Sequence, residues 1–346
     1  MRSHEGVIAS VVSIIIVNLN GKQLLGPCLD SLEAQIFKEF EVLLVDNGST
    51  DGSLRYVEAH YPQVRLLPQG SNLGFAAANN IGLREARGDL IALLNNDAEA
   101  HPNWLSKLVA ALEANPDIGF CASKMVLHSQ SHLADACGDF YTVEGVAGKI
   151  GHLEPASRYD EPREVFGACA GAAIYRRAVL EEVGGFDEDF FIVYEDSDLS
   201  FRARLLGYKC LYVPTAVVYH HLSATLGPQS DTAVYYAQRN MEFVFFKNMP
   251  APLLLKYLPL HFTTDLLLFI RYLFHRQARG FLKAKLHAMV MMPRMLEKRR
   301  QIQKSRRVSA AEIDRLLVRG YLWQKLSRTL RRGLRRPPVR GQQPQG

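Results

Sequence analysis

Short apolar runs alternate with amphipathic stretches over the first hundred residues of the chain. The runs are rich in aliphatic and β-branched side chains, and they cover Val11–Asn18, Glu41–Asp46, Val64–Leu67 and Leu90–Leu94. Continuous runs of this kind are typical of strands that are buried on both faces. A helical pattern follows each run, so we expect a Rossmann-like α/β fold with a mostly parallel sheet and helices on both faces.

The pattern is weaker downstream. Residues 121–166 are polar and show little periodicity, so they predict loops with at most a hairpin. Gly171–Tyr175 predicts a strand of small residues, and Leu199–Leu206 predicts a short helix. Two further short strands are expected, at Lys209–Val213 and at Val217–His220.

The chain changes character at Pro250. Two apolar blocks, Leu253–Leu260 and Leu266–Phe274, are interrupted by charged, polar and proline residues, and their longest unbroken apolar run has five residues, at 266–270. A membrane-spanning helix needs about 20 largely apolar residues. We therefore expect helices that lie in a membrane interface or pack on the body of the protein.

Charge divides the chain at the same place. Residues 1–249 contain 19 Lys and Arg against 31 Asp and Glu, whereas residues 250–346 contain 22 Lys and Arg against 4 Asp and Glu. We predict an acidic globular domain over 1–249, a basic helical region over 250–336 and a disordered tail over 337–346. Such asymmetry indicates an anionic partner for the basic region.

A membrane surface fits this region better than nucleic acid. Leu253–Phe274 is too apolar for a solvated arm and no nucleic-acid motif is present, so we expect no nucleic-acid partner. The five cysteines are scattered without a C-x-x-C pair, which argues against a zinc site or a disulfide framework and suits a reducing compartment. Since no signal-peptide pattern is visible either, we expect a cytoplasmic protein that is peripheral on the inner face of the cell membrane.

Polar clusters follow three of the predicted strands at their carboxyl ends. They are Asn18-Leu19-Asn20, the segment 46–51 and Asn95-Asn96-Asp97. Each cluster alone is more typical of a turn, but ligands of parallel sheets bind beyond the carboxyl ends of the strands, where all three clusters would meet. The Asp97 carboxylate can coordinate a hard divalent cation that bridges two phosphates of a nucleotide.

The same segments carry a resemblance to a known family. Over residues 10–248 the sequence is similar to glycosyltransferase family 2, whose nucleotide-diphospho-sugar transferase fold is called GT-A. The motifs that carry the similarity are VSIIIVNLNG (12–21), VLLVDNGSTDGS (42–53), NLGFAAANNIGLREARGDLIALLNNDA (72–98), GAAIYRRAVLEEVGGFDEDFFIVYEDSDLSFRARLLGY (171–208) and VPTAVVYHH (213–221). Within the family, the chain most resembles the bacterial rhamnosyltransferase-like branch.

The resemblance implies a nucleotide site at the edge of the sheet. It assigns Asp46 to the N3–H group of a pyrimidine, which suits a carboxylate because this group only accepts hydrogen bonds. It places Asn18 at the base or the ribose, and Asn72 and Asn79 along the nucleotide.

The resemblance also implies a cation, Mg²⁺ or Mn²⁺. Asn95, Asn96 and Asp97 occupy the position of the family's D-x-D motif, so the cation is expected at Asp97. His220 resembles a histidine that completes the metal or diphosphate site in some relatives. A partly buried histidine at the end of a strand is an equally supported alternative, and the neighbouring His221 leaves open which of the two faces the metal.

Further positions are implied on the side of the acceptor. Glu195-Asp196 resembles the family's E-D pair, in which the second residue is the catalytic base; the alternative is that Asp196, just before the predicted helix, only caps it. Arg239 aligns with a basic residue that could neutralise the leaving diphosphate. Gly171-Ala172 lies where relatives place small residues under the acceptor, although tight strand packing explains it equally well.

The function implied is that of an inverting glycosyltransferase. It would move L-rhamnose or a related deoxysugar from a pyrimidine nucleotide-diphosphate donor to a hydroxyl group of a glycan or a lipid-linked glycan. Two alternatives stay open, a nucleotidyltransferase and a non-catalytic sugar-nucleotide-binding protein on the same fold.

Overall fold

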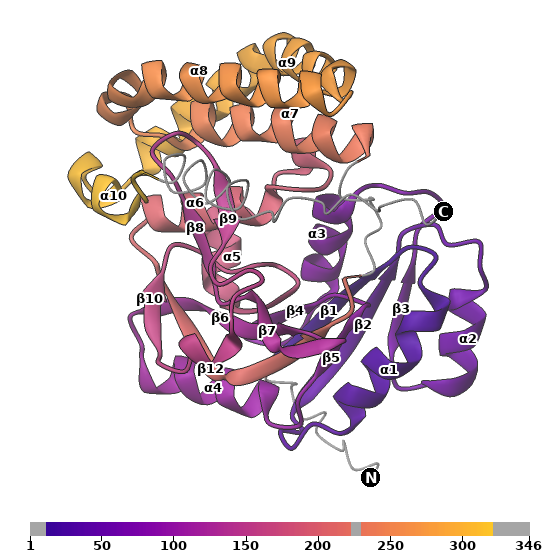
Figure 1. Ribbon diagram of the computed structural model, residues 1–346. Coiled ribbons are helices and arrows are strands. Elements are labelled where there is room, and N and C mark those ends of the chain that lie inside the picture. Colours follow the sequence, from indigo (N-terminus) through magenta and orange to yellow (C-terminus); the bar gives the residue numbers. More distant parts are fainter. Residues whose placement is uncertain (1–11, 223–229, 321–346) are drawn as a thin grey trace, which may run out of the picture.

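The computed structural model describes residues 12–222 and 230–320 (Figure 1). Within these ranges the chain forms one large sheet, helices on both of its faces and a group of C-terminal helices. The α/β class and the C-terminal helices expected from the sequence are therefore confirmed. The predicted disordered tail, 337–346, lies outside the described residues.

Four strands form the parallel part of the sheet, as the sequence predicted. They are β1 (Val12–Asn18), β2 (Phe40–Asp46), β3 (Arg65–Pro68) and β4 (Leu90–Leu94), in the spatial order β3-β2-β1-β4. Asn18 lies directly opposite Asp46 at the carboxyl ends of β1 and β2. The polar clusters that follow these strands consequently share one edge of the sheet.

The prediction of loops with at most a hairpin at 121–166 underestimates the strand content of this segment, in which hairpins do occur. This part of the chain contains most of the long strand β6 (Ile118–Leu127) and the shorter strands β7 (Gln130–Ala136), β8 (Asp139–Tyr141), β9 (Ala147–Lys149) and β10 (Arg163–Val165). Every residue of β6 is buried, so no alternation of apolar and polar positions marks it as a strand. Its Ser123 is satisfied inside the protein, where its hydroxyl accepts the indole N–H of Trp104 at 2.8 Å.

The second half of the sheet is mixed. β11 (Ala172–Arg176) runs antiparallel between β4 and β6, and β12 (Lys209–His220) runs parallel to β6. β12 is one strand with an irregularity between Val213 and Val217, where the sequence predicted two strands. The sheet order is β10-β12-β6-β11-β4-β1-β2-β3, and β5 (Ala98–Ala100) pairs with the end of β12.

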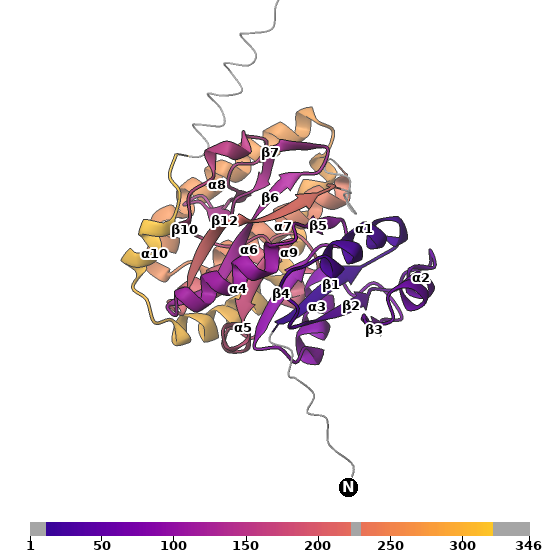
Figure 2. The same ribbon diagram turned by 90° about the horizontal axis from the view of Figure 1, so that it is seen from below.

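Helices cover both faces of the sheet, as predicted (Figures 1 and 2). One face is covered by α1 (Lys22–Glu33), α2 (Ser53–His60) and α4 (Trp104–Ala114). The other is covered by α3 (Phe75–Glu85), α5 (Arg177–Val183) and α6 (Glu195–Leu205). In α3, Gly82 lets the helix lie close to β1, since a Cβ at this position would collide with the side chain of Ile15.

Further helices stack beyond α6, at the top of Figure 1. They are α7 (Asp231–Asn248), α8 (Ala251–Phe274), α9 (Ala278–Ser305) and the short α10 (Ala310–Leu316). The two apolar blocks that the sequence separated are continuous in α8, which contains Pro259 in its interior.

In the described ranges, α8 is the one helix that is long and apolar enough to cross a membrane by length and composition alone. It has 24 residues, and the mean hydropathy of its qualifying 18-residue window is 1.4. Only 22% of that window is buried within the protein. The sequence argument underestimated this helix because it counted unbroken apolar runs, whereas scattered polar residues leave the average hydropathy high.

The C-terminal helices share a hydrophobic core with the rest of the molecule. Phe243 and Phe245 of α7, Leu253 of α8 and Met295 of α9 belong to the same buried cluster as Phe201 of α6. The core is continuous across the predicted boundary at 249/250. The division of the chain into domains there stays a prediction.

A buried ion pair connects α7 with α6 and with the segment that precedes α6. The Lys247 side chain is 1% exposed, and its ammonium lies 2.7 Å from Asp198 of α6 and also bonds to Asp187. Arg202 also pairs with Asp198 and Lys298 with Asp187, so removing the buried ammonium takes one of three cations away from two buried carboxylates and leaves part of their negative charge uncompensated.

We predict that Lys247→Met lowers the free energy of unfolding by about 3–5 kcal/mol, the usual cost of breaking a buried ion pair. Chemical denaturation followed by circular dichroism measures the change. Lys256→Met is the matched control, since Lys256 of α8 is exposed and pairs with Asp314 at the surface, and it should leave the unfolding midpoint nearly unchanged. Equal midpoints for the two variants would contradict a structural role for Lys247.

Candidate active site

A cavity of about 440 Å³ opens at the carboxyl edge of the sheet. Its lining comes from the ends of β1, β4 and β12, from the segment that precedes β11 and from the start of α6. The predicted site residues in this lining are Asn72, Asn95, Asn96, Asp97, Gly171, Glu195, Asp196 and His220. Residues from widely separated parts of the chain thus meet in one space, which is large enough for part of a nucleotide sugar.

A hydrogen-bonded chain of side chains joins the ends of β4, β1 and β2. The Asn96 amide donates to Asn18 Oδ1 at 2.8 Å, and the Asn18 amide donates to Asp46 Oδ1 at 3.0 Å. The backbone N–H of Ser49 donates to the other Asp46 oxygen at 2.9 Å. Glycine is needed at position 21, next to these hydrogen-bonded side chains, because a Cβ there would collide with the Asn96 amide.

Asn18 and Asp46 therefore lie behind the cavity lining and not in it. Both side chains are fully buried, and both oxygens of Asp46 accept hydrogen bonds from the protein. In this conformation Asp46 positions the loop after β2, and a direct contact with a nucleotide base would require these bonds to be exchanged. The role that the resemblance implies for Asp46 stays a prediction.

Asp97 and His220 lie side by side in the wall of the cavity. His220 Nε2 lies 3.1 Å from Asp97 Oδ1, and His220 Nδ1 lies 2.9 Å from Oδ2 of the buried Asp135. Burial alone would lower the pKa of His220, but the hydrogen bonds to Asp135 and Asp97 raise it to about 9. In the absence of a cation, this raised pKa favours the positively charged imidazolium form of His220, which lies between the carboxylates of Asp97 and Asp135.

The same three side chains fit a divalent cation. One carboxylate oxygen and one imidazole nitrogen 3.1 Å apart can ligate the same ion, with substrate phosphates completing its coordination. An imidazole that binds a metal commonly donates its second N–H group to a carboxylate, the place that Asp135 occupies here. Sequence analysis missed Asp135 because it lies in the segment that was expected to form loops.

Asp196 and Glu195 lie in the first turn of α6. The helix begins at Glu195, so Asp196 is inside it and not just before it as predicted. Asp196 is partly exposed to the cavity and accepts hydrogen bonds from the backbone N–H groups of Ser197 at 2.7 Å and Ala170 at 3.3 Å. Burial raises the pKa of Asp196, and these N–H groups oppose that rise.

Glu195 differs from its neighbour. Its side chain is buried, and Oε2 has no hydrogen-bond partner among the described residues. Burial, reinforced by the charge of Asp196, raises the pKa of Glu195 well above its ordinary value. The two environments push the pKa values apart, so that Asp196 ionises more readily than Glu195.

Lys149 also lines the cavity and was missed. Its ammonium lies 2.9 Å from Asp135 Oδ2, and its positive charge favours the ionised form of Asp196. Like Asp135, Lys149 lies in the segment for which loops were predicted. No local motif distinguishes it from an ordinary surface lysine.

The loop before Asp196 has a strained backbone. Phe191, Val193 and Tyr194 have φ values of 65°, 69° and 73°. Residues other than glycine rarely adopt this backbone conformation, and β-branched residues adopt it least of all. Phe191 and Val193 line the cavity, and Tyr194 is the residue that precedes the helix. Such a conformation persists only where the surrounding structure holds it.

Two side chains of α7 hold this loop. Asn240 donates to the carbonyl groups of Phe190, Ile192 and Val193 at 3.0, 2.9 and 2.6 Å. Arg239 donates to the carbonyl groups of Asp189 and Phe190, both at 2.8 Å.

Arg239 is buried and does not line the cavity, so the structure does not bring it to the predicted diphosphate side. We call Arg239 and Asn240 together the loop clamp. Asn240 was missed because nothing in YYAQRNMEF indicates which side chains point to the loop.

Of the remaining predicted residues, some line the cavity and others are buried away from it. Asn72 lines the cavity and accepts a hydrogen bond from Asn47 at 2.9 Å, whereas Asn79 is buried and donates to the carbonyl of Phe75 within α3. Gly171 lines the cavity next to Asn95, and Ala172 is buried in β11 opposite Leu94.

The family can now be assigned. Residues 13–184 match the family model of glycosyl transferase family 2. The N-acetylglucosaminyl-diphospho-decaprenol L-rhamnosyltransferase of Mycobacterium tuberculosis is 32% identical over 235 residues, which cover 60% of this chain and 76% of that protein. The chain belongs to glycosyltransferase family 2. The similarity also supports the rhamnosyltransferase-like branch that the sequence predicted.

Other relatives of this glycosyltransferase are much longer. Protein y4gI of Sinorhizobium fredii is 30% identical over 251 residues, but the match covers 68% of this chain and only 27% of that protein. The O-antigen biosynthesis protein RfbC of Myxococcus xanthus is 30% identical over 244 residues, and the match covers 65% of this chain and 19% of that protein.

Solved structures agree on the fold of the glycosyltransferase. GalNAc-T7 with UDP, GalNAc and Mn²⁺ matches with a TM-score of 0.56 and 19% identity, over 70% of this chain and 48% of that one. The mannosyltransferase PcManGT of Pyrobaculum calidifontis with GDP-Man and Mn²⁺ matches with a TM-score of 0.52 and 19% identity, over 91% of this chain and 88% of that one. The GT-A fold is thereby confirmed.

We predict that Asn240→Ala lowers kcat of the glycosyltransferase by about 10- to 100-fold, because a displacement of about 1 Å at a reacting group has an effect of this size. The affinity for a nucleotide diphosphate should stay close to that of the wild type, since Asn240 lies on the side of Asp196 and not of Asp97. Steady-state kinetics and calorimetry separate the two quantities.

Asn103→Ala is the control for this prediction, because the Asn103 side chain makes no capping hydrogen bond at the start of α4. A wild-type kcat for Asn240→Ala would show that the loop keeps its conformation without the clamp.

Proposed function

We propose that this family-2 enzyme is an inverting glycosyltransferase with Asp196 as its general base and a divalent cation at Asp97 and His220. The observation that carries the proposal is the shared cavity: the carboxylate at the start of α6 and the metal-binding pair at the end of β4 and β12 line the same space. A donor bound by its diphosphate at one wall would present its sugar to the other.

The leaving group is stabilised at the wall formed by Asp97 and His220. When a cation is bound there, it supplies positive charge to the departing nucleotide diphosphate. Asp97 and His220 orient the diphosphate, with Asp135 fixing the imidazole through its second nitrogen. Lys149, which also lines the cavity, adds a positive charge that belongs to the protein itself.

The acceptor reacts at the opposite wall. Its hydroxyl oxygen attacks the anomeric carbon from the face opposite to the diphosphate, the bond between that carbon and the diphosphate oxygen breaks, and the electron pair leaves with the nucleotide. The hydroxyl proton passes to the Asp196 carboxylate. Burial raises the pKa of Asp196, which makes the carboxylate a better proton acceptor, and the N–H groups of Ala170 and Ser197 and the charge of Lys149 oppose that rise.

The donor and acceptor follow from similarity. The Mycobacterium tuberculosis relative is named as an L-rhamnosyltransferase that acts on a decaprenol-linked diphospho-sugar, and the Myxococcus xanthus relative as an O-antigen biosynthesis protein. We therefore propose L-rhamnose or a related deoxysugar on a pyrimidine nucleotide diphosphate as donor. The acceptor would be a glycan or a lipid-linked glycan in polysaccharide biosynthesis.

A lipid-linked acceptor requires access to a membrane, and α8 and α9 present a surface that suits one. The large apolar side chains exposed on these helices are Leu255, Leu260, Phe262, Leu266, Leu267, Ile270, Leu273, Phe274, Leu282, Leu286, Met289, Val290 and Leu296. Basic residues such as Arg271, Arg279 and Lys283 lie among them in the sequence. We propose that this surface, the α8–α9 face, binds the anionic cytoplasmic side of the membrane.

We predict that Asp196→Asn lowers the transfer rate by about 100- to 10,000-fold, the usual contribution of a general base, while nucleotide binding is kept. Release of nucleotide diphosphate from dTDP-L-rhamnose and from UDP-sugars, with Mn²⁺ or Mg²⁺, measures the rate, and calorimetry measures binding. The matched control is Asp160→Asn, which changes an exposed carboxylate. Unchanged turnover would remove Asp196 as the base and leave a nucleotide-binding role.

We predict that the full chain floats with vesicles that contain anionic lipid and does so less at high salt, because the attraction has an electrostatic part. A charge at the α8–α9 face, as in Phe274→Glu combined with Val290→Glu, should reduce flotation. Ile36→Glu, which changes an exposed apolar residue on the other side of the sheet, should not. Equal flotation of all three proteins would refute the proposed surface.

A further inference from the structure

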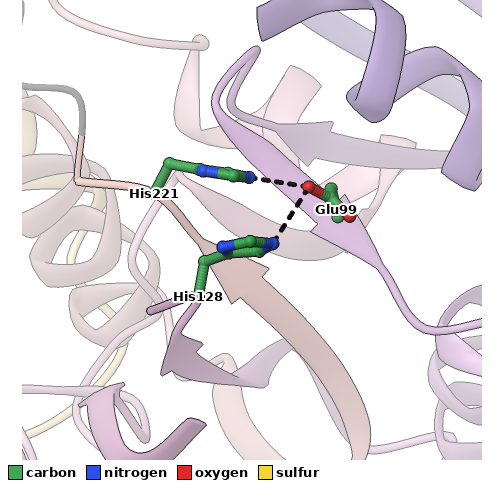
Figure 3. Close-up of side chains that lie close together, drawn as sticks. All are labelled: Glu99, His128 and His221. Atoms are coloured by element: carbon green, nitrogen blue, oxygen red, sulfur yellow. Dashed lines mark hydrogen bonds and ion pairs between the residues drawn. The ribbon is translucent and has the colours of Figure 1, made fainter. Parts of the chain in front are cut away.

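A second group of metal-binding side chains lies outside the cavity. Glu99 of β5, His128 directly after β6 and His221 directly after β12 point toward one another (Figure 3). None of the three lines the cavity that holds Asp97 and His220. The adjacent histidines at the end of β12 are therefore divided, with His220 facing Asp97 and His221 facing Glu99.

The three ligand atoms are already close enough for one ion. His221 Nε2 lies 2.7 Å and His128 Nε2 lies 3.4 Å from the same oxygen of Glu99, Oε1. The two imidazole rings are stacked, with centroids 3.8 Å apart and planes 20° from parallel, so a rotation of one ring about its side-chain bonds would have to accompany binding for both Nε2 atoms to face the same ion. Ligands of a four-coordinate ion with bonds of about 2.0–2.1 Å are separated by similar distances.

From this arrangement we propose that Glu99, His128 and His221 bind a transition-metal ion of the Zn²⁺ class. Two imidazoles and one carboxylate are a common protein ligand set for zinc, with water in the fourth position. Imidazole nitrogen favours Zn²⁺ and similar ions over Mg²⁺, which prefers oxygen. The sequence argument against a zinc site considered only cysteine spacing, and so it did not address this site.

No other cation occupies the place of the ion among the described residues, because Glu99 forms ion pairs there only with His128 and His221. A second group, formed by Glu242, His261 and Asp265, differs in this respect. The ammonium of Lys285 bonds to both carboxylates of that group and already supplies the positive charge. Of the two groups, the one at Glu99 is therefore the better candidate for a metal ion.

The proposed ion would link β5 with the end of β12, next to Asp97 and His220. Glu99 of β5 lies two residues after Asp97, which precedes that strand, and His221 follows His220 at the end of β12. The backbone N–H of His221 also donates to the carbonyl of Asp97 at 2.9 Å. An ion at this site would act on the geometry of Asp97 and His220 from outside the cavity, without contact with the substrate.

The test is metal titration of the tag-free full chain in an Asp97→Asn background, which weakens the competing pair in the cavity. Co²⁺ reports coordination through its visible absorption, and Zn²⁺ added afterwards should displace it while an excess of Mg²⁺ should not. In the same background, His128→Ala combined with His221→Ala should weaken binding by more than the about 10- to 100-fold that is typical when a partner of a ligand is removed.

The matched control replaces two exposed histidines outside the group, His60→Ala and His132→Ala, and should bind as the parent does. Circular dichroism checks that all variants fold alike. The proposal is overturned if the parent binds no Co²⁺ or Zn²⁺. It is equally overturned if the His128/His221 variant keeps the parent's affinity, or if the control loses as much affinity as that variant.

Discussion

The structure depends on the hydrogen bonds that the loop clamp makes to the backbone before α6. The role proposed for Asp196 requires a fixed distance from Asp97, yet the backbone that leads into Asp196 has three positive φ angles. Asn240 and Arg239 satisfy the carbonyl groups of that loop and hold it in a conformation that its sequence alone would not favour. The site is thus built by α7 as much as by the sheet.

The C-terminal helices consequently contribute to the catalytic geometry and do not merely attach to it. Lys298 of α9 bonds to Asp187 and Asp189, which precede the strained loop, at 2.5 and 2.7 Å. Tyr235 of α7, one turn before Arg239, stacks on His287 of α9. If α8 and α9 lie on a membrane, as proposed, these contacts connect that surface with the loop that precedes Asp196, and a lipid-linked acceptor would reach the cavity from the same side as α7.

Sequence patterns sufficed to predict strands and the residues at their ends, because these features depend on neighbouring residues in the chain. Buried strands such as β1 and β4 are continuous aliphatic runs, and their carboxyl ends locate Asn96 and Asp97 without any knowledge of the fold. The resemblance implied that Asp196 and His220 belong to the same site as these ends, and in the structure Asn96, Asp97, Asp196 and His220 line one cavity.

Contacts between distant segments could not be predicted in this way. β6 is buried on both faces and contains Lys, Ser and Gly, so its sequence pattern resembles that of a loop. Because loops were predicted for the whole segment 121–166, Asp135 and Lys149 were not considered as site residues. Arg239 was assigned to the diphosphate because it aligns with a basic residue of the family that could neutralise the leaving group. The side chain of Arg239 points to the carbonyl of Phe190 because of how α7 packs, and no spacing in the sequence reveals that packing.

The most direct test of the central claim is a crystal structure of the Asp196→Asn variant with an intact nucleotide-sugar donor and Mn²⁺. The account predicts an anomalous Mn²⁺ peak between Asp97 and His220, with the diphosphate next to it and the anomeric carbon facing residue 196. A peak away from Asp97 and His220, or a sugar directed away from residue 196, would contradict it.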